Sequence, residues 1–561
     1  MTAAAQRIRC HFTQPGGSRL MARRFGRFRL AACIAATAVV VASCGQAHGA
    51  TETGSQVKQG GDLVYLDAEV TASMQIQVSY WQNSLVKDQL LDRLVYQDPE
   101  TFEFVPWIAR SWTVDEPGTT YQFVIRDGVT YSDGTPLDAA SVKRNIEWLA
   151  EGDKPKGIPR NAWFPKVTAV DTDAAARTVT VHLAEPNAPF LAALSMNTAG
   201  LVADATIDAS KEDQSVVTNL IGSGPFVAES EIPNKEIRLV KRRGYDWAPA
   251  TANHQGEAYL DSVTVVPIEE DSIRVGALRS GESDALRYTQ PPDEALLQKE
   301  GFTVLGLRTP GLANVLDVRQ TADFVDDVNV RKAVMYGIDR DQIVSTLYSD
   351  NWKPANSIIT EGALGWKDRS DEVRFDPDEA NRRLDASGWT TRNADGIREK
   401  DGRQLELSLY IDVYDHTSKP LYELVQRQLR AVGISLQLRQ TDFANYPKAT
   451  ADPKLSLRRN GWPTADTFRL TQNYDSDQGD LFQLEGNDPY LDGLLRSQVT
   501  ETDRTKRIAL IEQIQDHVID NAYTIPLLLD TQIFAVAPHI HDFRNAANSV
   551  PWFYDTWTEH K

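Results

Sequence analysis

The sequence has many carboxylates but lacks the residue patterns that carry common catalytic chemistry. It contains no G-x-S-x-G, H-E-x-x-H, phosphate-binding loop or paired C-x-x-C pattern, which leaves nucleophilic, zinc-dependent and nucleotide-dependent reactions without a motif. His539-Ile540-His541 is the closest pair among nine histidines, and a single pair at this spacing is weak evidence for a metal. Because acidic residues occur along the whole chain, no two of them stand out as an acid and a base. The sequence therefore predicts binding rather than catalysis, without a metal or another cofactor.

Two further patterns resemble ligand loops but do not complete them. Asp475, Asp477 and Asp480 have the early spacing of a calcium loop, but no glutamate follows at the required position. Gly222-Ser223-Gly224-Pro225 predicts a sharp chain reversal, and it lacks the lysine of a phosphate loop. Neither pattern predicts a bound ion or nucleotide.

Charge and cysteine content restrict the partners. The formal net charge is −19, and the first 43 residues carry seven arginines and no acid, so the remaining chain has 52 basic and 78 acidic residues. Such an acidic surface repels nucleic acid and anionic lipid, and we expect no nucleic-acid partner. Cys10, Cys33 and Cys44 all lie in the first 44 residues, so the folded part must be stable without disulfides.

Residues 1–43 have the features of a secretory leader. Four arginines between positions 23 and 29 precede Leu30–Val41, a run of 12 mainly apolar residues. This run is too short to span a bilayer as a stable helix, so a leader is favoured over a membrane anchor. The start codon, Met1 or Met21, and the export route, Sec or twin-arginine, stay open.

The leader ends in Val41-Ala42-Ser43-Cys44, which resembles a bacterial lipobox. In a lipobox the cysteine after the small residues becomes the acylated first residue, so we expect Cys44 to anchor the exported protein to the outer face of the cell membrane. Residues 44–59 are rich in Gly, Ser, Thr and Gln and predict a flexible tether. An ordinary leader with an incidental cysteine is the alternative.

Elements that could position a binding site alternate between strands and helices. Tyr121, Phe123 and Ile125 occupy every second position and predict a half-buried strand. After two Asp-Gly turns, Asp138 is placed to cap a helix. A second helix is predicted from Pro377, capped by the preceding aspartate and stopped by a glycine. Strands alternating with helices place the chain in the α/β class.

The first of these stretches resembles a known family. IRDGVTYSDGTPLDAASV at 125–142 is similar to the signature segment of the family 5 extracellular solute-binding proteins, the oligopeptide, dipeptide and nickel receptors of ABC importers. Further similar segments follow the same order as in that family, and together they extend over roughly residues 60 to 550. They include LLDRLVYQDPETFEFVPWIARSW at 90–112, Pro189-Phe190-Leu191, the glycine-rich turn at 222–226 and FDPDEANRRLDASGW at 375–389.

The resemblance implies an α/β fold with two lobes, periplasmic-binding-protein-like of type II, with an extra inserted subdomain. Lobe I would comprise 58–93, 221–306 and 526–561, and the inserted subdomain 94–220. Lobe II would comprise 307–525, with hinges near 306 and 526. We expect a monomer that grips its solute between the lobes, because closure is favoured by contacts that both lobes make to the ligand.

The candidate binding residues follow from the chemistry of such a cleft, which needs aromatic walls and a few placed charges. Trp81, Trp352 and Trp462 are candidates for the walls, and Arg459 for a charge that binds a carboxylate. The resemblance adds Asp317, which falls near a position where many members of the family carry an asparagine at the cleft. In peptide receptors of the family, an aspartate of a Trp-rich motif binds the α-amino group of the ligand. The stretch 461–468 resembles that motif in two registers: one puts Gly461 at the aspartate position, and the other places Asp466 one residue late.

The main hypothesis is therefore a lipid-anchored receptor that delivers a peptide or similar small solute to an ABC permease with a separate ATPase. A non-peptide ligand, such as a nickel chelate or a small polar or sulfur-containing compound, is the alternative. A secreted hydrolase on a similar frame and a surface interaction protein are more distant alternatives.

Overall fold

The structure is a computed structural model of the full chain. It describes residues 57–68, 73–77, 81–412, 418–441, 445–464, 466–477 and 488–560. The predicted leader, Cys44 and most of the tether lie outside these ranges. In the described part, no helix is both long enough and apolar enough to cross a membrane.

A seven-stranded mixed sheet forms the frame of the first lobe. Its strands follow the order β12-β21-β11-β1-β10-β9-β8. They are β1 (Asp62–Asp67), β8 (Phe226–Ile232), β9 (Glu236–Lys241), β10 (Ser262–Pro267), β11 (Ala285–Arg287), β12 (Thr303–Arg308) and β21 (Thr531–Val536). β1 runs parallel to both β10 and β11, so these three strands end at the same edge. Helices α6 (Asp271–Ser280) and α7 (Pro291–Lys299) connect the strands at this end of the sheet.

A five-stranded sheet forms the frame of the second lobe, in the order β18-β17-β19-β13-β20. Its strands are β13 (Gly311–Val318), β17 (Glu406–Asp412), β18 (Ser435–Thr441), β19 (Leu457–Pro463) and β20 (Thr524–Leu528). β17 is parallel to β18 and to β19, so these strands also end at one edge. The helices of this part are α8 (Val328–Tyr336), α9 (Arg340–Leu347), α10 (Ser370–Val373), α11 (Pro377–Ala386), α12 (Ser418–Ala431), α13 (Tyr446–Thr450), α14 (Arg469–Tyr474), α15 (Pro489–Thr500) and α16 (Arg504–Asp520).

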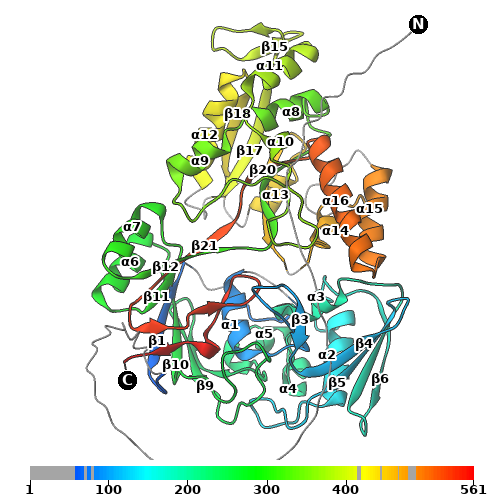
Figure 1. Cartoon of the computed structure of the whole chain (residues 1–561), viewed down its shortest axis with the longest axis vertical. Coiled ribbons are helices and arrows are strands. Elements are labelled where there is room, and N and C mark those ends of the chain that lie inside the picture. The colour runs from blue at the N-terminus through cyan, green and yellow to red at the C-terminus, as the bar shows by residue number, and fades with distance from the viewer. Residues whose placement is uncertain are drawn as a thin grey trace, which may run out of the picture. The chain divides into compact units, whose positions relative to one another are not determined.

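An antiparallel four-stranded sheet with α2 (Ala139–Glu151) contains the stretch that carried the family resemblance, drawn in cyan in Figure 1. Its strands are β4 (Ala109–Val114), β5 (Thr120–Ile125), β6 (Val167–Asp173) and β7 (Thr178–Leu183). The predicted alternation in β5 is confirmed, since Tyr121, Phe123 and Ile125 are all buried. The predicted cap is also confirmed: the Asp138 carboxylate accepts the backbone N–H groups of Ala140 and Ser141.

The remaining elements are short. They are α1 (Trp81–Leu90), β2 (Val95–Gln97), β3 (Phe104–Pro106), α3 (Phe190–Ser195), α4 (Asp204–Asp208), α5 (Lys211–Gln214), β14 (Thr391–Arg392), β15 (Arg398–Lys400), β16 (Arg403–Gln404), β22 (Ile540–His541), β23 (Arg544–Asn545), β24 (Pro551–Trp552) and β25 (Trp557–Thr558). The predicted helix from Pro377 is confirmed as α11, with the Asp376 carboxylate accepting the Glu379 N–H at 2.9 Å.

Buried apolar side chains form two large cores. One holds residues between Leu63 and Leu297 and between Phe534 and Tyr554. The other holds residues between Leu312 and Leu528. The chain passes from one sheet to the other twice, at 308–311 and at 528–531. The predicted α/β, bilobal type II fold is confirmed, whereas the residue boundaries predicted for the lobes and the inserted subdomain stay predictions.

Two buried ionisable groups near α1 make stability depend on pH. Burial raises the pKa of Asp92 to about 7, although Trp247 Nε1 donates to its carboxylate at 2.7 Å. Burial lowers the pKa of Lys87 to about 7, and its ammonium donates to Gln75 O at 2.7 Å.

These shifts predict a minimum of stability near neutral pH. An aspartate of the unfolded chain titrates near pH 4 and a lysine near pH 10. The folded state holds the Asp92 proton more tightly, so stability falls as the pH rises from about 4 to about 7. The folded state holds the Lys87 proton less tightly, so stability rises with pH above about 7. Urea unfolding of the wild type and Asp92→Asn across pH 4 to 9 measures both effects.

The variant should lose the part of the decline that Asp92 causes, which is on the order of 4 kcal/mol at about 1.36 kcal/mol for each pKa unit. Lys87→Met should lose the rise above pH 7 and keep the decline below it. A wild-type profile parallel to that of Asp92→Asn between pH 4 and 7 would contradict the raised pKa.

Candidate ligand-binding site

The strand directions single out one edge of each sheet, because open α/β sheets bind ligands at the carboxyl ends of their parallel strands. In the first lobe these ends are Asp67, Pro267 and Arg287. In the second lobe they are Asp412, Thr441 and Pro463. These two edges define the candidate ligand-binding site.

The edge of the first lobe carries a buried ion pair beside a partly exposed tyrosine. Arg287 Nη1 lies 3.2 Å from Asp67 Oδ2, and both side chains are buried. The guanidinium also lies 4.0 Å from the centre of the Tyr288 ring, a cation–π contact. Tyr288 is 38% exposed and has a backbone φ of 62°, a conformation that is costly for a bulky residue. The ion pair and the ring contact hold this phenol at the edge.

One guanidinium stabilises this unusual backbone. The Arg274 side chain is fully buried on α6 and donates to Ile268 O at 2.6 Å and Glu269 O at 2.9 Å, just after β10. It also donates to Arg287 O at 3.2 Å and to Tyr288 O at 3.3 Å, at the end of β11. Arg274 therefore joins the ends of two parallel strands, a geometry that its fork of donors allows.

Asp317, predicted to be a ligand contact, lies inside a polar network of the second lobe. Its carboxylate accepts Asn460 Nδ2 and Thr524 Oγ1, each at 2.7 Å, and lies 3.9 Å from Arg458 Nη2. Asn460 Nδ2 also donates to Asn473 Oδ1 at 2.6 Å. These contacts join β13, β19, β20 and α14, so they give Asp317 a structural role. A role in ligand binding stays a prediction.

Gly461 lies opposite an irregularity in β13. The register between β13 and β19 shifts between Leu312 and Val315. A Cβ at position 461 would lie 3.4 Å from Ala313 O and from Asn314 Cα, which is ordinary contact. The position can therefore accept a Cβ, and as a glycine it gives β19 no carboxylate here.

Asp466, the alternative candidate for an α-amino contact, forms a buried ion pair with Arg507 of α16. Arg507 Nη1 donates to Asp466 Oδ2 at 2.7 Å, and Nη2 donates to Oδ1. Phe468 N also donates to Oδ1, at 2.8 Å. Both oxygens are thus engaged within the chain, and the contacts of Asp466 favour a structural role over ligand binding.

The other predicted residues lie on three elements. Arg459 is half-buried in β19, and Trp462 follows on the same strand, paired with Leu312. Trp81 is the first residue of α1. Trp352 follows α9 and packs against Tyr348, with 4.6 Å between ring centres. The structure thus brings Asp317, Arg459 and Trp462 onto adjacent strands of one sheet, whereas Trp81 and Trp352 belong to other elements.

The residues at the edge of the first lobe were not predicted from the sequence. Asp67, Arg287 and Tyr288 each stand at or directly after the end of a short strand. The one local feature that could have indicated them is a polar residue at the end of an apolar strand. Strand direction, which decides which strand ends share an edge, cannot be read from that local pattern.

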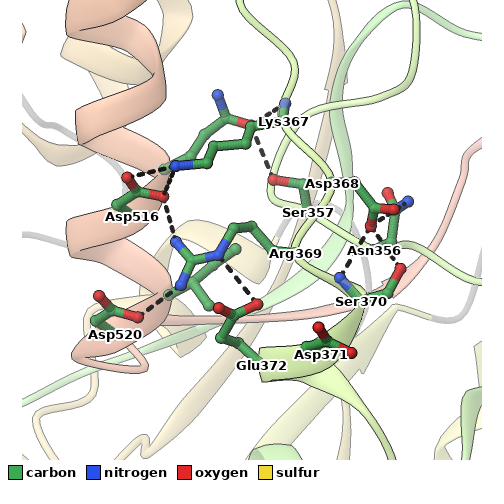
Figure 2. Close-up of polar contacts among 12 residues, drawn as sticks. Asn356, Ser357, Lys367, Asp368, Arg369, Ser370, Asp371, Glu372, Asp516 and Asp520 are labelled. Atoms are coloured by element: carbon green, nitrogen blue, oxygen red, sulfur yellow. Dashed lines mark hydrogen bonds and ion pairs between the residues drawn. The ribbon is translucent and has the colours of Figure 1, made fainter. Parts of the chain in front are cut away.

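Two hollows lie on the second lobe. The larger, of about 440 Å³, is lined by charged residues of α16 and of the segment 367–372 (Figure 2). Arg369 pairs there with Asp516 at 2.5 Å, Asp520 at 2.7 Å and Glu372 at 3.2 Å. Lys367 Nζ lies 2.7 Å from Asp516. Both cations are paired, and the described residues that line the hollow include no aromatic side chain, so it lacks the features of a solute site.

The second hollow, of about 380 Å³, lies beside the candidate edge. It is lined by Tyr410, Thr441, Asn445, Lys448, Ala449 and Asp452, which belong to β17, β18 and the region of α13. Within the described ranges, no group of three or more His, Cys, Asp or Glu side chains is arranged to hold a metal ion.

Two lobes, each with a central sheet whose parallel strands end at a polar edge, define a ligand-binding protein of the bilobal type II class. The family model of the bacterial extracellular solute-binding proteins, family 5 (middle region), matches residues 103–480. The chain belongs to this family, the solute-binding proteins of ABC transporters, and the predicted function is confirmed at that level.

Relatives with different ligands are about equally similar to the chain. The dipeptide-binding protein of Escherichia coli (strain K12) is 25% identical over 470 residues, 77% of this chain and 82% of that protein. The nickel-binding periplasmic protein of the same organism is 24% identical over 474 residues, 80% of this chain and 86% of that protein. NikA from Brucella suis, in complex with Fe(III)-EDTA, has a TM-score of 0.78 at 23% identity, over 89% of this chain and 100% of that structure.

The ion pair of Asp466 provides a test of its structural role. Asp466→Asn leaves the buried Arg507 guanidinium without a counter-charge, so we expect the free energy of unfolding to fall by about 3 to 5 kcal/mol. Glu361→Gln, which breaks the exposed pair with Arg308 at 2.8 Å, is the control and should cost less than about 1 kcal/mol. Urea unfolding compares the two variants, and equal small losses would contradict the structural role.

Proposed function

We propose that the chain captures a peptide-sized solute between its lobes and delivers it to an ABC permease. The observation that carries this proposal is the pair of polar strand edges on two lobes that two passages of the chain connect. A solute that contacts both edges favours closure, because it binds the closed state more tightly than the open state. No bond is made or broken in this function, and a monomer suffices for it.

A peptide is the proposed class of ligand. Dipeptide-binding and oligopeptide-binding proteins are among the relatives at 25% and 26% identity. The nickel-binding relative is 24% identical, so a metal chelate is the second candidate for the ligand. Arg459, half-buried in β19 next to the candidate edge, is the proposed contact of a ligand carboxylate.

Ligand binding should raise the thermal stability of the protein by mass action. A ligand at 100 times its Kd stabilises the folded state by about 2.7 kcal/mol. Thermal unfolding is measured with di- to pentapeptides, nickel chelates, Fe(III)-EDTA and glutathione, each at millimolar concentration. We expect a higher Tm with at least one peptide class and no change with the chelates. A panel in which no peptide raises the Tm would remove peptides as ligands.

Arg459→Gln tests whether Arg459 binds the carboxylate of the ligand, in the same thermal unfolding experiment. The variant should bind free-acid peptides about tenfold or more weakly than the wild type does, and its affinity for the corresponding C-terminal amides should be unchanged. Arg439→Gln is the matched control, since this exposed arginine pairs only loosely with Asp452, at 3.4 Å. Equal losses for acids and amides would show that Arg459 supports the fold rather than the ligand.

We also propose that Cys44 is acylated and holds the exported protein at the outer face of the membrane. Val41-Ala42-Ser43-Cys44 and the tether at 44–59 support this anchor. In a bacterial host, Cys44→Ala should release the protein from the membrane fraction, whereas Cys33→Ala, in the apolar run of the leader, should not. Membrane association of Cys44→Ala equal to that of the wild type would contradict acylation.

A further inference from the structure

The first turn of α7 holds a buried carboxylate that is only half satisfied. Glu294 is 3% exposed. Its Oε2 accepts Ser349 Oγ at 2.7 Å and Asn351 Nδ2 at 2.6 Å. Its Oε1 is buried and has no hydrogen-bond partner among the described residues. A buried carboxylate oxygen without a donor is costly, so the arrangement calls for an explanation.

Glu294 lies at the candidate edge and at a contact between the lobes. α7 begins at Pro291, shortly after β11 ends at Arg287, so its first turn stands at the edge where parallel strands end. Ser349 and Asn351 come from the segment after α9 in the second lobe. Asn351 also packs closely on β12, because a Cβ at Gly306 would lie 2.7 Å from the Asn351 side chain.

Other buried polar atoms without partners gather at the same edge. In the described ranges they include Thr289 Oγ1, Thr309 Oγ1 and Gln532 Oε1. Thr289 N donates to Ile533 O at 3.4 Å, and Thr309 N to Asp530 O at 2.9 Å, which places both threonines beside the start of β21. With Glu294 Oε1, all of these atoms can accept a hydrogen bond.

The chemistry of this set favours a cationic donor. Burial raises the pKa of Glu294 above its ordinary range, and the hydrogen bonds from Ser349 and Asn351 only partly oppose this effect. No cation faces the carboxylate within hydrogen-bond distance in the described ranges. A primary ammonium offers three donors and one positive charge, which would satisfy Oε1 and compensate for the desolvation of the carboxylate.

We propose that Glu294 binds a primary ammonium group of the solute at the edge where Thr289, Thr309 and Gln532 also lie. The proposal rests on the proposed function and names the chemical class of its ligand, an amine-bearing peptide. Gly461 supplies no carboxylate to β19, so in this chain the counter-charge for an amine comes from the first lobe instead.

Glu294→Gln tests the proposal because a glutamine can still accept from Ser349 and Asn351 while it lacks the charge. The probes are a tri- to pentapeptide library with free amino termini, the same library N-acetylated, and cadaverine. Asp293→Asn, which removes the neighbouring carboxylate on α7, is the matched control. We expect the affinity of Glu294→Gln for the free-amine peptides to fall at least about tenfold. Its affinity for the N-acetyl peptides, and the affinities of Asp293→Asn for both libraries, should be unchanged. Calorimetry measures the affinities.

Three outcomes would overturn the proposal, and they are distinguishable from one another. If free-amine peptides bind Glu294→Gln as tightly as the wild type, Glu294 is not the contact, although the proposed function stands. If only the N-acetyl peptides bind the wild type, the solute is not an amine. If none of the probes binds, the peptide function fails as well. Glu294→Asp, which keeps the charge on a shorter side chain, should retain part of the affinity, and a Tm of Glu294→Gln equal to that of the wild type excludes misfolding as the cause.

Discussion

The hydrogen bond from Thr309 N to Asp530 O, at 2.9 Å, joins the two segments by which the chain passes between its sheets. One segment leads from β12 to β13 and the other from β20 to β21. Two passages that lie side by side are the arrangement expected of a hinge, and rotation of the lobes about them stays a prediction. The passages also leave from the edge where the parallel strands of the first lobe end. A solute bound there, as proposed, would lie close to the two passages.

Three buried guanidinium groups join neighbouring elements of the two lobes. Arg274 donates to four carbonyls at the ends of β10 and β11, and Arg507 is paired with Asp466 beside β19. Arg340 of α9 plays a similar role by joining β20 and α10, because it donates to Pro526 O at 2.6 Å and to Val373 O at 2.6 Å. Each of these side chains is almost completely buried. Their fixed forks of donors keep the strand ends in place before any ligand arrives.

The sequence predicted local elements better than the partners of polar side chains. The strand at 120–125, the Asp138 cap and the helix from Pro377 depend on neighbours within a few residues, and all three are confirmed. Asp466 and Asp317 became candidates through the family resemblance, which says nothing about their partners in this chain. The partner of Asp466, Arg507, is 41 residues away, and Thr524, a partner of Asp317, is 207 residues away. A carboxylate that is satisfied by the fold and one that is free for a ligand look identical until such distant contacts are known.

Glu294 differs from these two carboxylates in the way its oxygens are satisfied. Asp317 and Asp466 have donors on both oxygens, whereas Glu294 has two donors on one oxygen and none on the other within the described chain. Those two donors come from the second lobe, so the carboxylate already contributes to the contact between the lobes. A ligand cation on the remaining oxygen would add binding energy in the conformation where these contacts exist. Because a ligand shifts a conformational equilibrium only by its differential affinity for the two states, a carboxylate shared between lobe contact and ligand couples binding directly to closure.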